Sequence, residues 1–239
     1  MTNGEHKPRV SVIIPAFNCE AYLAEAIESA LGQTCPPAEI IVIDDGSTDG
    51  TAVVAQRFGS LVRYDYQEHK GIGGGRNHGA ELATGDLLAS LDADDRWVAD
   101  KLEIQLAAWQ ANPAVDMIFG QARQLRHGTE WNEGVKDSKY NGSELMAGMV
   151  PGTMLIRKDD FFRVGLFRTD LKVGEFIDWY TRAIDAGLKP LTLPNLMLWR
   201  RVHDTNQGIR ERQSVTDYAR VLKASLDRRR AGSAGPERE

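Results

Sequence analysis

Three carboxylates stand close together where an apolar segment of the chain ends. They are Asp92, Asp94 and Asp95, with Ala93 among them, and they follow the apolar run 87–91. Carboxylates at this spacing raise each other's pKa unless a cation lies between them. Mg²⁺ prefers oxygen ligands and usually leaves coordination positions open for the phosphates of a substrate. The segment therefore favours a metal site, and a solvated acidic turn is the alternative.

A second acidic segment, residues 44–50, also follows an apolar run, and the elements before both segments show one alternating pattern. Residues 10–14, 40–43 and 61–66 and the run before Asp92 have strand length, and segments of helical spacing separate them. Asn18 is expected to cap the first helix. The pattern predicts an α/β fold with a central, mostly parallel sheet and helices on both faces. Ligands bind beyond the carboxyl ends of such strands, so the two acidic segments should share a rim.

The composition excludes several classes of protein. A net charge of −5 over 239 residues gives no general attraction to nucleic acid. No run reaches the length of a membrane span, and the N-terminus lacks the apolar core of an export signal. Cys19 and Cys35 lack the spacing of a redox or zinc site, so free thiols are expected. These features predict a cytoplasmic protein without a transmembrane segment.

The glycine-rich segment 71–77 departs from the known phosphate-binding loops. Arg76 replaces the last glycine of the dinucleotide fingerprint, and the segment follows the third expected strand rather than the first. We expect a glycine-rich turn before a helix at 76–83. The turn would carry Arg76 towards an anionic ligand, and the alternative leaves Arg76 in solvent.

Several motifs occur in the order typical of family-2 glycosyltransferases of the glycosyltransferase-A fold. The chain resembles this family in the segments 15–18, 44–49, 76–77, 92–95, 152–155 and 201–206 and at Glu175. The resemblance implies a glycosyltransferase-A-like fold in which residues 8–120 bind a nucleoside diphosphate sugar. Residues 121–227 would shape the acceptor site of the same domain. The charged segment 228–239 is expected to be a disordered tail.

The resemblance also implies which residues bind the donor: Pro15, Ala16, Phe17, Asn18, Asp45, Arg76, Asp92 and Ala93. Asp45 would accept the N3–H of uracil. Cytosine has no donor at that position, whereas guanine has its N1–H. Phe17 would lie against the base or pack in the core, and Asp92 would hold hydroxyl groups of the ribose or the sugar.

Asp94, Asp95 and His203 would form the metal site, with Mn²⁺ or Mg²⁺ as the cofactor. Asp94 would bind the ion that bridges the diphosphate. Asp95 would be a second ligand or would orient its neighbours. His203 matches a histidine that often completes the metal or diphosphate site in this fold.

The catalytic base departs from the family pattern of Glu-Asp at the start of a helix. Here Phe176 follows Glu175 and stands where the aspartate is expected. Glu175 and Asp178 are three residues apart and would share a helix face. Asp178 is favoured as the base, and Glu175 as its neighbour or as a group that binds the acceptor.

The resemblance therefore implies a metal-dependent, inverting hexosyltransferase that moves a sugar, expected from a UDP-sugar, to an acceptor hydroxyl. Two alternatives remain open. A sugar-nucleotide pyrophosphorylase would have a glycine-rich basic segment after the first strand, where this chain has Pro15–Asn18. A catalytically silent nucleotide-sugar-binding module would explain the missing Glu-Asp pair.

Overall fold

The structure is a computed structural model that describes residues 8–126, 146–203, 206 and 214–233. Within these residues, nine strands form one sheet. Eight of them follow the order β3-β2-β1-β4-β8-β6-β9-β5, and β7 pairs with β6. The strands are β1 (Val10–Ala16), β2 (Glu39–Asp44), β3 (Arg63–Tyr66), β4 (Leu87–Ser90), β5 (Arg96–Trp97), β6 (Met117–Arg126), β7 (Met146–Gly148), β8 (Leu155–Arg157) and β9 (Pro190–Val202).

The strands β1 to β4 pair with one another in parallel, as predicted. β1 lies between β2 and β4, and β3 pairs with β2 in the same direction. β6 and β9 are also parallel, whereas β5, β7 and β8 run antiparallel to their neighbours. Because β1 to β4 are parallel, their carboxyl ends meet at one edge of the sheet.

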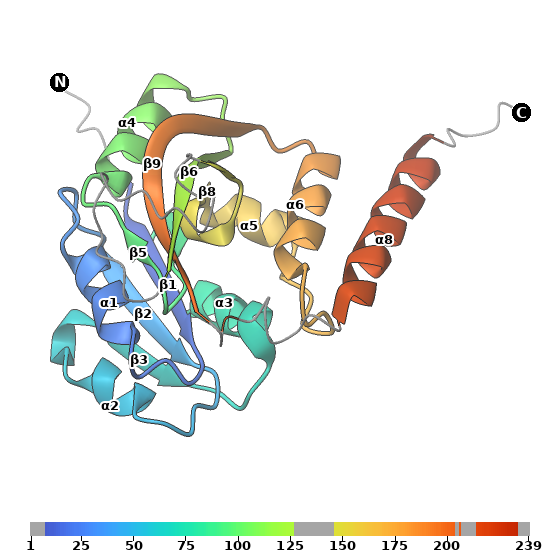
Figure 1. The fold of residues 1–239 in the computed structure, drawn as a ribbon. Coiled ribbons are helices and arrows are strands. Elements are labelled where there is room, and N and C mark those ends of the chain that lie inside the picture. The colour runs from blue at the N-terminus through green and yellow to red at the C-terminus, as the bar shows by residue number, and fades with distance from the viewer. Residues whose placement is uncertain (1–7, 127–145, 204–205, 207–213, 234–239) are drawn as a thin grey trace, which may run out of the picture.

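Helices cover both faces of the sheet (Figure 1). They are α1 (Leu23–Leu31), α2 (Thr51–Gln56), α3 (Gly71–Leu82), α4 (Lys101–Ala111), α5 (Lys158–Val164), α6 (Glu175–Asp185) and α8 (Val215–Ser233), with short 3₁₀ turns at Gly59–Leu61 and Pro151–Thr153. One core contains side chains of α1, α2 and α4, and the other those of α3, α5 and α6. Neighbouring residues of β1, Val12 and Ile13, belong to different cores. This explains why the strand is apolar throughout.

The glycine-rich segment is helical, so the prediction of a turn there is wrong. α3 begins at Gly71. A Cβ atom at Gly79 would collide with the side chain of Ile13, and one at Gly75 would lie 3.0 Å from the Cβ of Pro15. Glycine is a poor helix former, but at these positions it lets α3 pack directly against β1. Tertiary packing thus overrides the local preference.

The C-terminal prediction also needs correction. α8 continues to Ser233, so the first residues of the expected tail at 228–239 are helical. Arg228 of α8 donates to Asp185 at 3.0 Å and to Thr181 at 2.9 Å, both on α6. Residues 234–239 lie outside the described part of the chain. The division into halves at residue 120 stays a prediction, because strands from both sides join one sheet.

Within the described residues, no helix is long and apolar enough to cross a membrane. Both cysteines are free thiols, as predicted. Burial raises the pKa of Cys19 to about 12, so its sulfur is held as the thiol.

Lys101 is a buried lysine of the core, and it gives the fold a pH-dependent stability. Its Nζ lies 3.9 Å from the centre of the Trp97 ring and donates to Gln105 at 2.9 Å. Burial lowers the pKa of Lys101 well below its usual value of 10.5. Between the lowered pKa and 10.5 the unfolded chain binds more protons than the folded one. The free energy of unfolding should therefore rise with pH, by up to about 1.4 kcal/mol per pH unit.

Lys101→Met should remove this slope and stabilise the protein most at the lower pH values. Methionine has a similar length and makes favourable contacts with aromatic rings. Urea unfolding of both proteins at several pH values between 6 and 10 measures the effect. Parallel curves for the two proteins would contradict the assignment.

Candidate active site

Both acidic segments lie at the carboxyl edge of the parallel strands, on either side of β1. Ala16 at the end of β1 pairs with Asp44, and the N–H of Asp45 donates to the carbonyl of Ala16 at 2.8 Å. On the other side, the N–H of Leu91 donates to the carbonyl of Ile13 at 2.9 Å. Asp92, the next residue, therefore follows the opposite neighbour of β1. The structure brings the two segments to one rim.

The end of β1 leads into this rim. Pro15 and Ala16 are buried, whereas Phe17 is half-buried. The ring of Phe17 lies against that of His69, with 4.3 Å between the ring centres. Phe17 belongs to neither apolar core. Its position at the rim is compatible with a stacking role.

Asn18 ties two loops of the rim together and does not cap α1, which begins five residues later. Its φ of 52° is in the left-handed region, which asparagine tolerates better than most residues. Its Oδ1 accepts a hydrogen bond from the N–H of Thr48 at 2.8 Å, and its N–H donates to Ser47 Oγ at 3.0 Å. The loops after β1 and β2 are thereby fixed relative to each other.

Asp45 is a buried carboxylate that is surrounded by donors. Its Oδ1 accepts from the side chain of Gln67 at 2.5 Å and from the N–H of Lys70 at 2.8 Å. Its Oδ2 accepts from the N–H of Gly71 at 2.9 Å and lies 2.9 Å from Nδ1 of His69. Two of these donors are backbone groups where α3 begins, a place that favours negative charge.

Arg76 joins the acidic rim to the second half of the chain. Its guanidinium donates to Asp92 at 2.6 Å and to Glu175 at 2.8 Å. It is 3% exposed, so the alternative that placed it in solvent is wrong. Burial alone would lower the pKa of Arg76, but the charges of Asp92 and Glu175 outweigh burial and raise it. The Arg76 cation thus neutralises two carboxylates that come from distant parts of the sequence.

Asn77, the next residue, makes a second connection to the same region. Its Nδ2 donates to the carbonyl of Phe167 at 2.9 Å, and its Oδ1 accepts from the N–H of Phe167 at 2.9 Å. Both bonds go to the backbone. Through Arg76 and Asn77, α3 holds the start of α6 and the loop before it.

Asp94 and His203 meet at the rim. His203 Nε2 lies 2.9 Å from Asp94 Oδ2, and the side chain of Asn206 donates to the same oxygen at 2.8 Å. Asp94 follows β4 and His203 follows β9, so the sheet brings them together across 109 residues.

Asp95 turns away from this group and is 3% exposed. Its Oδ1 accepts from the N–H of Arg201 at 2.9 Å. Burial, and then the charges of Asp94 and Asp92, raise the pKa of Asp95 well above its usual range. This geometry suits the orienting role that was one of its two predicted roles.

The side chains at this rim fit a divalent cation whose remaining coordination positions are filled by a bound substrate. Within the described residues, no three histidine, cysteine or acidic side chains form a closed metal site. Asp94 offers a carboxylate oxygen and His203 an imidazole nitrogen at nearly the same point. One or two protein ligands are usual where substrate phosphates supply the others.

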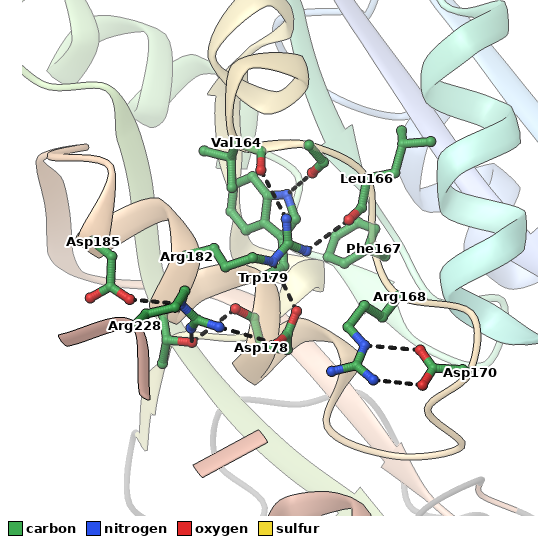
Figure 2. Close-up of polar contacts among 12 residues, drawn as sticks. Val164, Leu166, Phe167, Arg168, Asp170, Asp178, Trp179, Arg182, Asp185 and Arg228 are labelled. Carbon is green, nitrogen blue, oxygen red and sulfur yellow. Dashed lines mark hydrogen bonds and ion pairs between the residues drawn. The ribbon is translucent and has the colours of Figure 1, made fainter. Parts of the chain in front are cut away.

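Asp178 lies away from the rim, in a network that joins α6, α8 and the loop after α5 (Figure 2). It is 1% exposed, and its Oδ2 accepts from Arg182 at 2.9 Å. Arg182 in turn donates to the carbonyls of Val164 at 2.8 Å and Leu166 at 2.7 Å. Arg228 of α8 lies 3.9 Å from the other oxygen of Asp178. This burial argues against Asp178 as the base, and its contacts are those of a structural carboxylate.

Glu175 is better placed, as the first residue of α6 beside Arg76. Its side chain is 12% exposed, and Oε1 accepts from Arg76. Phe176, which stands where the family has aspartate, is 7% exposed and packs in the core with Trp179. The helix periodicity turns position 176 inward, so its apolar side chain is stable there and Glu175 is the acid left at the rim.

Sequence reasoning missed three polar groups of the rim: Gln67, His69 and Asn206. Asn206 lies within the segment 201–206 that carries the resemblance, and that motif offered a signal. Gln67 and His69 stand in a polar segment after β3 with no spacing that would single them out. Their contact with Asp45 depends on how the ends of β2 and β3 meet.

The family follows from comparison with known proteins. Residues 11–165 match the model described as glycosyl transferase family 2. The chain belongs to glycosyl transferase family 2. It is therefore a glycosyltransferase, and the fold described above is the scaffold of a sugar-transfer enzyme.

Relatives of this glycosyltransferase extend over most of the chain. An uncharacterised glycosyltransferase of Rickettsia typhi is 31% identical over 244 residues, which cover 95% of this chain and 74% of the relative. Chondroitin synthase of Escherichia coli is 33% identical over 147 residues, 60% of this chain and 21% of the synthase. The chain thus spans a small part of some relatives.

Solved structures confirm the glycosyltransferase-A-like fold. S. aureus TarS 1-349 in complex with UDP superposes with a TM-score of 0.71 at 21% identity, over 92% of this chain and 65% of the other. The mannosyltransferase PcManGT from Pyrobaculum calidifontis, in complex with GDP-Man and Mn²⁺, gives a TM-score of 0.65 at 21% identity over the same shares.

Proposed function

We propose that this glycosyltransferase moves a sugar from a UDP-sugar to a hydroxyl group of an acceptor, with inversion and with a divalent cation. The observation that carries the proposal is the bridge of Arg76 between Asp92 and Glu175. It sets a carboxylate of the donor side next to an acid at the start of α6. The structural neighbours bind UDP, UDP-GlcNAc, and GDP-Man with Mn²⁺, which supports a nucleotide-sugar donor.

Donor binding uses the rim. Asp45 accepts an N–H of the base, and the ring of Phe17 lies against it. Pro15, Ala16, Asn18 and Ala93 form the backbone around the nucleotide. Asp92, whose side chain is 29% exposed, has its Oδ1 held by Arg76 and offers the remaining oxygen to sugar hydroxyls. The specificity for uracil or guanine over cytosine follows because N3–H of uracil and N1–H of guanine can donate to Asp45, whereas the ring N3 of cytosine carries no proton.

Asp94 and His203 would hold Mn²⁺ or Mg²⁺, with Asp95 in support. When bound, the ion supplies positive charge for the diphosphate that leaves. Asn206 donates to Asp94 and holds the carboxylate in place.

Glu175 is the proposed base in place of Asp178. Arg76 fixes Oε1, and within the described residues Oε2 has no hydrogen-bond partner, so Oε2 is the atom that takes the proton of the acceptor hydroxyl. The oxygen of the acceptor then forms a bond to the anomeric carbon as the bond to the diphosphate breaks. Attack from the face opposite the leaving group inverts the configuration at that carbon.

A thermal-shift panel of UDP, GDP, CDP and TDP, with and without Mn²⁺, tests the donor site. A nucleotide at 100 times its Kd should stabilise the fold by about 2.7 kcal/mol. We expect UDP with Mn²⁺ to give the largest shift and CDP the smallest. Asp94→Asn should lose the part of the shift that depends on Mn²⁺ while keeping the unliganded unfolding temperature. Equal shifts for all four nucleotides would contradict the role of Asp45.

The buried Phe176 favours a second candidate, a silent module that binds nucleotide sugars without transferring them. Release of UDP from a panel of UDP-sugars separates the two functions. Turnover supports the transferase, and tight binding without turnover, with any acceptor, supports the module.

A further inference from the structure

His69 contacts Phe17 and Asp45, the two side chains that the proposed function assigns to the base of the nucleotide. Its ring centre is 4.3 Å from that of Phe17, with an angle of 33° between the ring planes. Its Nδ1 is 2.9 Å from Asp45 Oδ2 and 3.0 Å from the carbonyl oxygen of Asp45. One imidazole therefore lies against the Phe17 ring and beside Oδ2 of Asp45, the two places that a nucleobase would take.

Each carboxylate oxygen of Asp45 has two polar neighbours while His69 stays in place. A carboxylate offers about four lone-pair sites. Oδ1 faces Gln67 and the N–H of Lys70, and Oδ2 faces the N–H of Gly71 and His69. An incoming N–H must therefore displace one of these four groups.

His69 is the group that can leave. The N–H groups of Lys70 and Gly71 belong to the backbone where α3 begins, and Gln67 is 6% exposed. The His69 side chain is 56% exposed, whereas that of Asp45 is 3% exposed. The open side of Asp45 is thus the side that His69 covers.

Displacement of His69 from Asp45 would need only a rotation of its side chain. Gly46 has a φ of +82°, and a Cβ atom there would lie 3.1 Å from the backbone nitrogen of His69. The backbone at His69 is thus packed against the loop after β2. The side chain alone has the room to turn into solvent.

A base does not fit between the two rings. Ring centres of stacked pairs lie about 4.5–7 Å apart, and the Phe17–His69 pair is already at 4.3 Å. We propose that His69 is a displaceable occupant of the nucleobase site. It admits a base that gives a ring N–H to Asp45 and a flat face to Phe17; uracil and guanine have such a ring N–H and cytosine does not. The inference rests on the proposed function.

His69→Ala tests the proposal through the sign of its effect. Removal of the occupant should lower the Kd of UDP by about two- to tenfold, the range of the net contribution of one ordinary hydrogen bond. Calorimetric titration with UDP and Mn²⁺ measures the change. His78→Ala is the matched control, because His78 pairs with Asp65 at 3.3 Å and contacts none of these residues; its Kd should equal that of the wild type. Urea unfolding checks that both variants fold.

The ring resonances of His69, assigned by their loss in His69→Ala, give a second measurement. Saturating UDP should shift them towards those of a solvent-exposed histidine, and CDP at the same concentration should leave them unchanged. A weaker Kd for UDP in His69→Ala, or unchanged resonances at saturation, would overturn the inference and leave the donor site intact. If the wild type bound neither UDP nor GDP, the proposed function would be overturned as well.

Discussion

Glu175→Gln is expected to lower kcat for sugar transfer by about 10²–10⁴-fold, the usual contribution of a general base. Glutamine keeps the length of the side chain and an oxygen for Arg76, but it cannot take a proton from the acceptor. The KM for the donor should change little, because the contacts of Asp45 and Phe17 stay in place. Steady-state release of UDP in the presence of acceptor measures both constants.

Asp178→Asn is the matched control on the same helix. Asp178 is buried against Arg182, so its replacement should lower the free energy of unfolding by about 1–3 kcal/mol. The kcat of the folded variant should stay close to that of the wild type. The reverse result, with activity lost in Asp178→Asn and kept in Glu175→Gln, would restore Asp178 as the base.

Arg76→Met should destabilise the protein by about 3 kcal/mol, the lower end of the cost of breaking a buried ion pair. The lower end applies because the Asp92 side chain is 29% exposed and gains water when the cation is lost. The variant leaves two carboxylates without their shared cation. It should also lose most of its activity, because nothing then holds Glu175 towards the donor. Urea unfolding and UDP release measure the two losses.

Two further variants separate charge from geometry. Arg76→Lys keeps the charge but cannot bridge two carboxylates with a planar fork, so it should recover part of the stability and little activity. Arg168→Met breaks the surface ion pair between Arg168, whose side chain is 34% exposed, and Asp170, whose side chain is 52% exposed. It should lower the free energy of unfolding by less than about 1 kcal/mol. Equal losses of stability and activity in Arg76→Met and Arg168→Met would show that the buried bridge contributes no more than a surface ion pair.

The features best predicted from the sequence were those with a regular hydrophobic pattern. The apolar strands β1, β2 and β4 bury both faces, so their pattern is strong, and their ends had to carry Asp45 and Asp92 to one edge. The sequence predicted poorly what depends on a distant partner. The glycines of α3 suggest a turn until Ile13 and Pro15 are packed against them. Asp178 looks equivalent to Glu175 at helical spacing, and only the fold shows that Arg182 and α8 enclose it.

The bond pair between Asn77 and Phe167 has a consequence for how such enzymes diversify. Asn77 recognises the main chain of Phe167, whose side chain takes no part in either bond. A substitution in this loop that preserves the backbone therefore leaves both bonds in place. Chimaeras that replace the segment after residue 165 with that of a relative should keep its alignment with α3 as long as Asn77 and the loop length are kept.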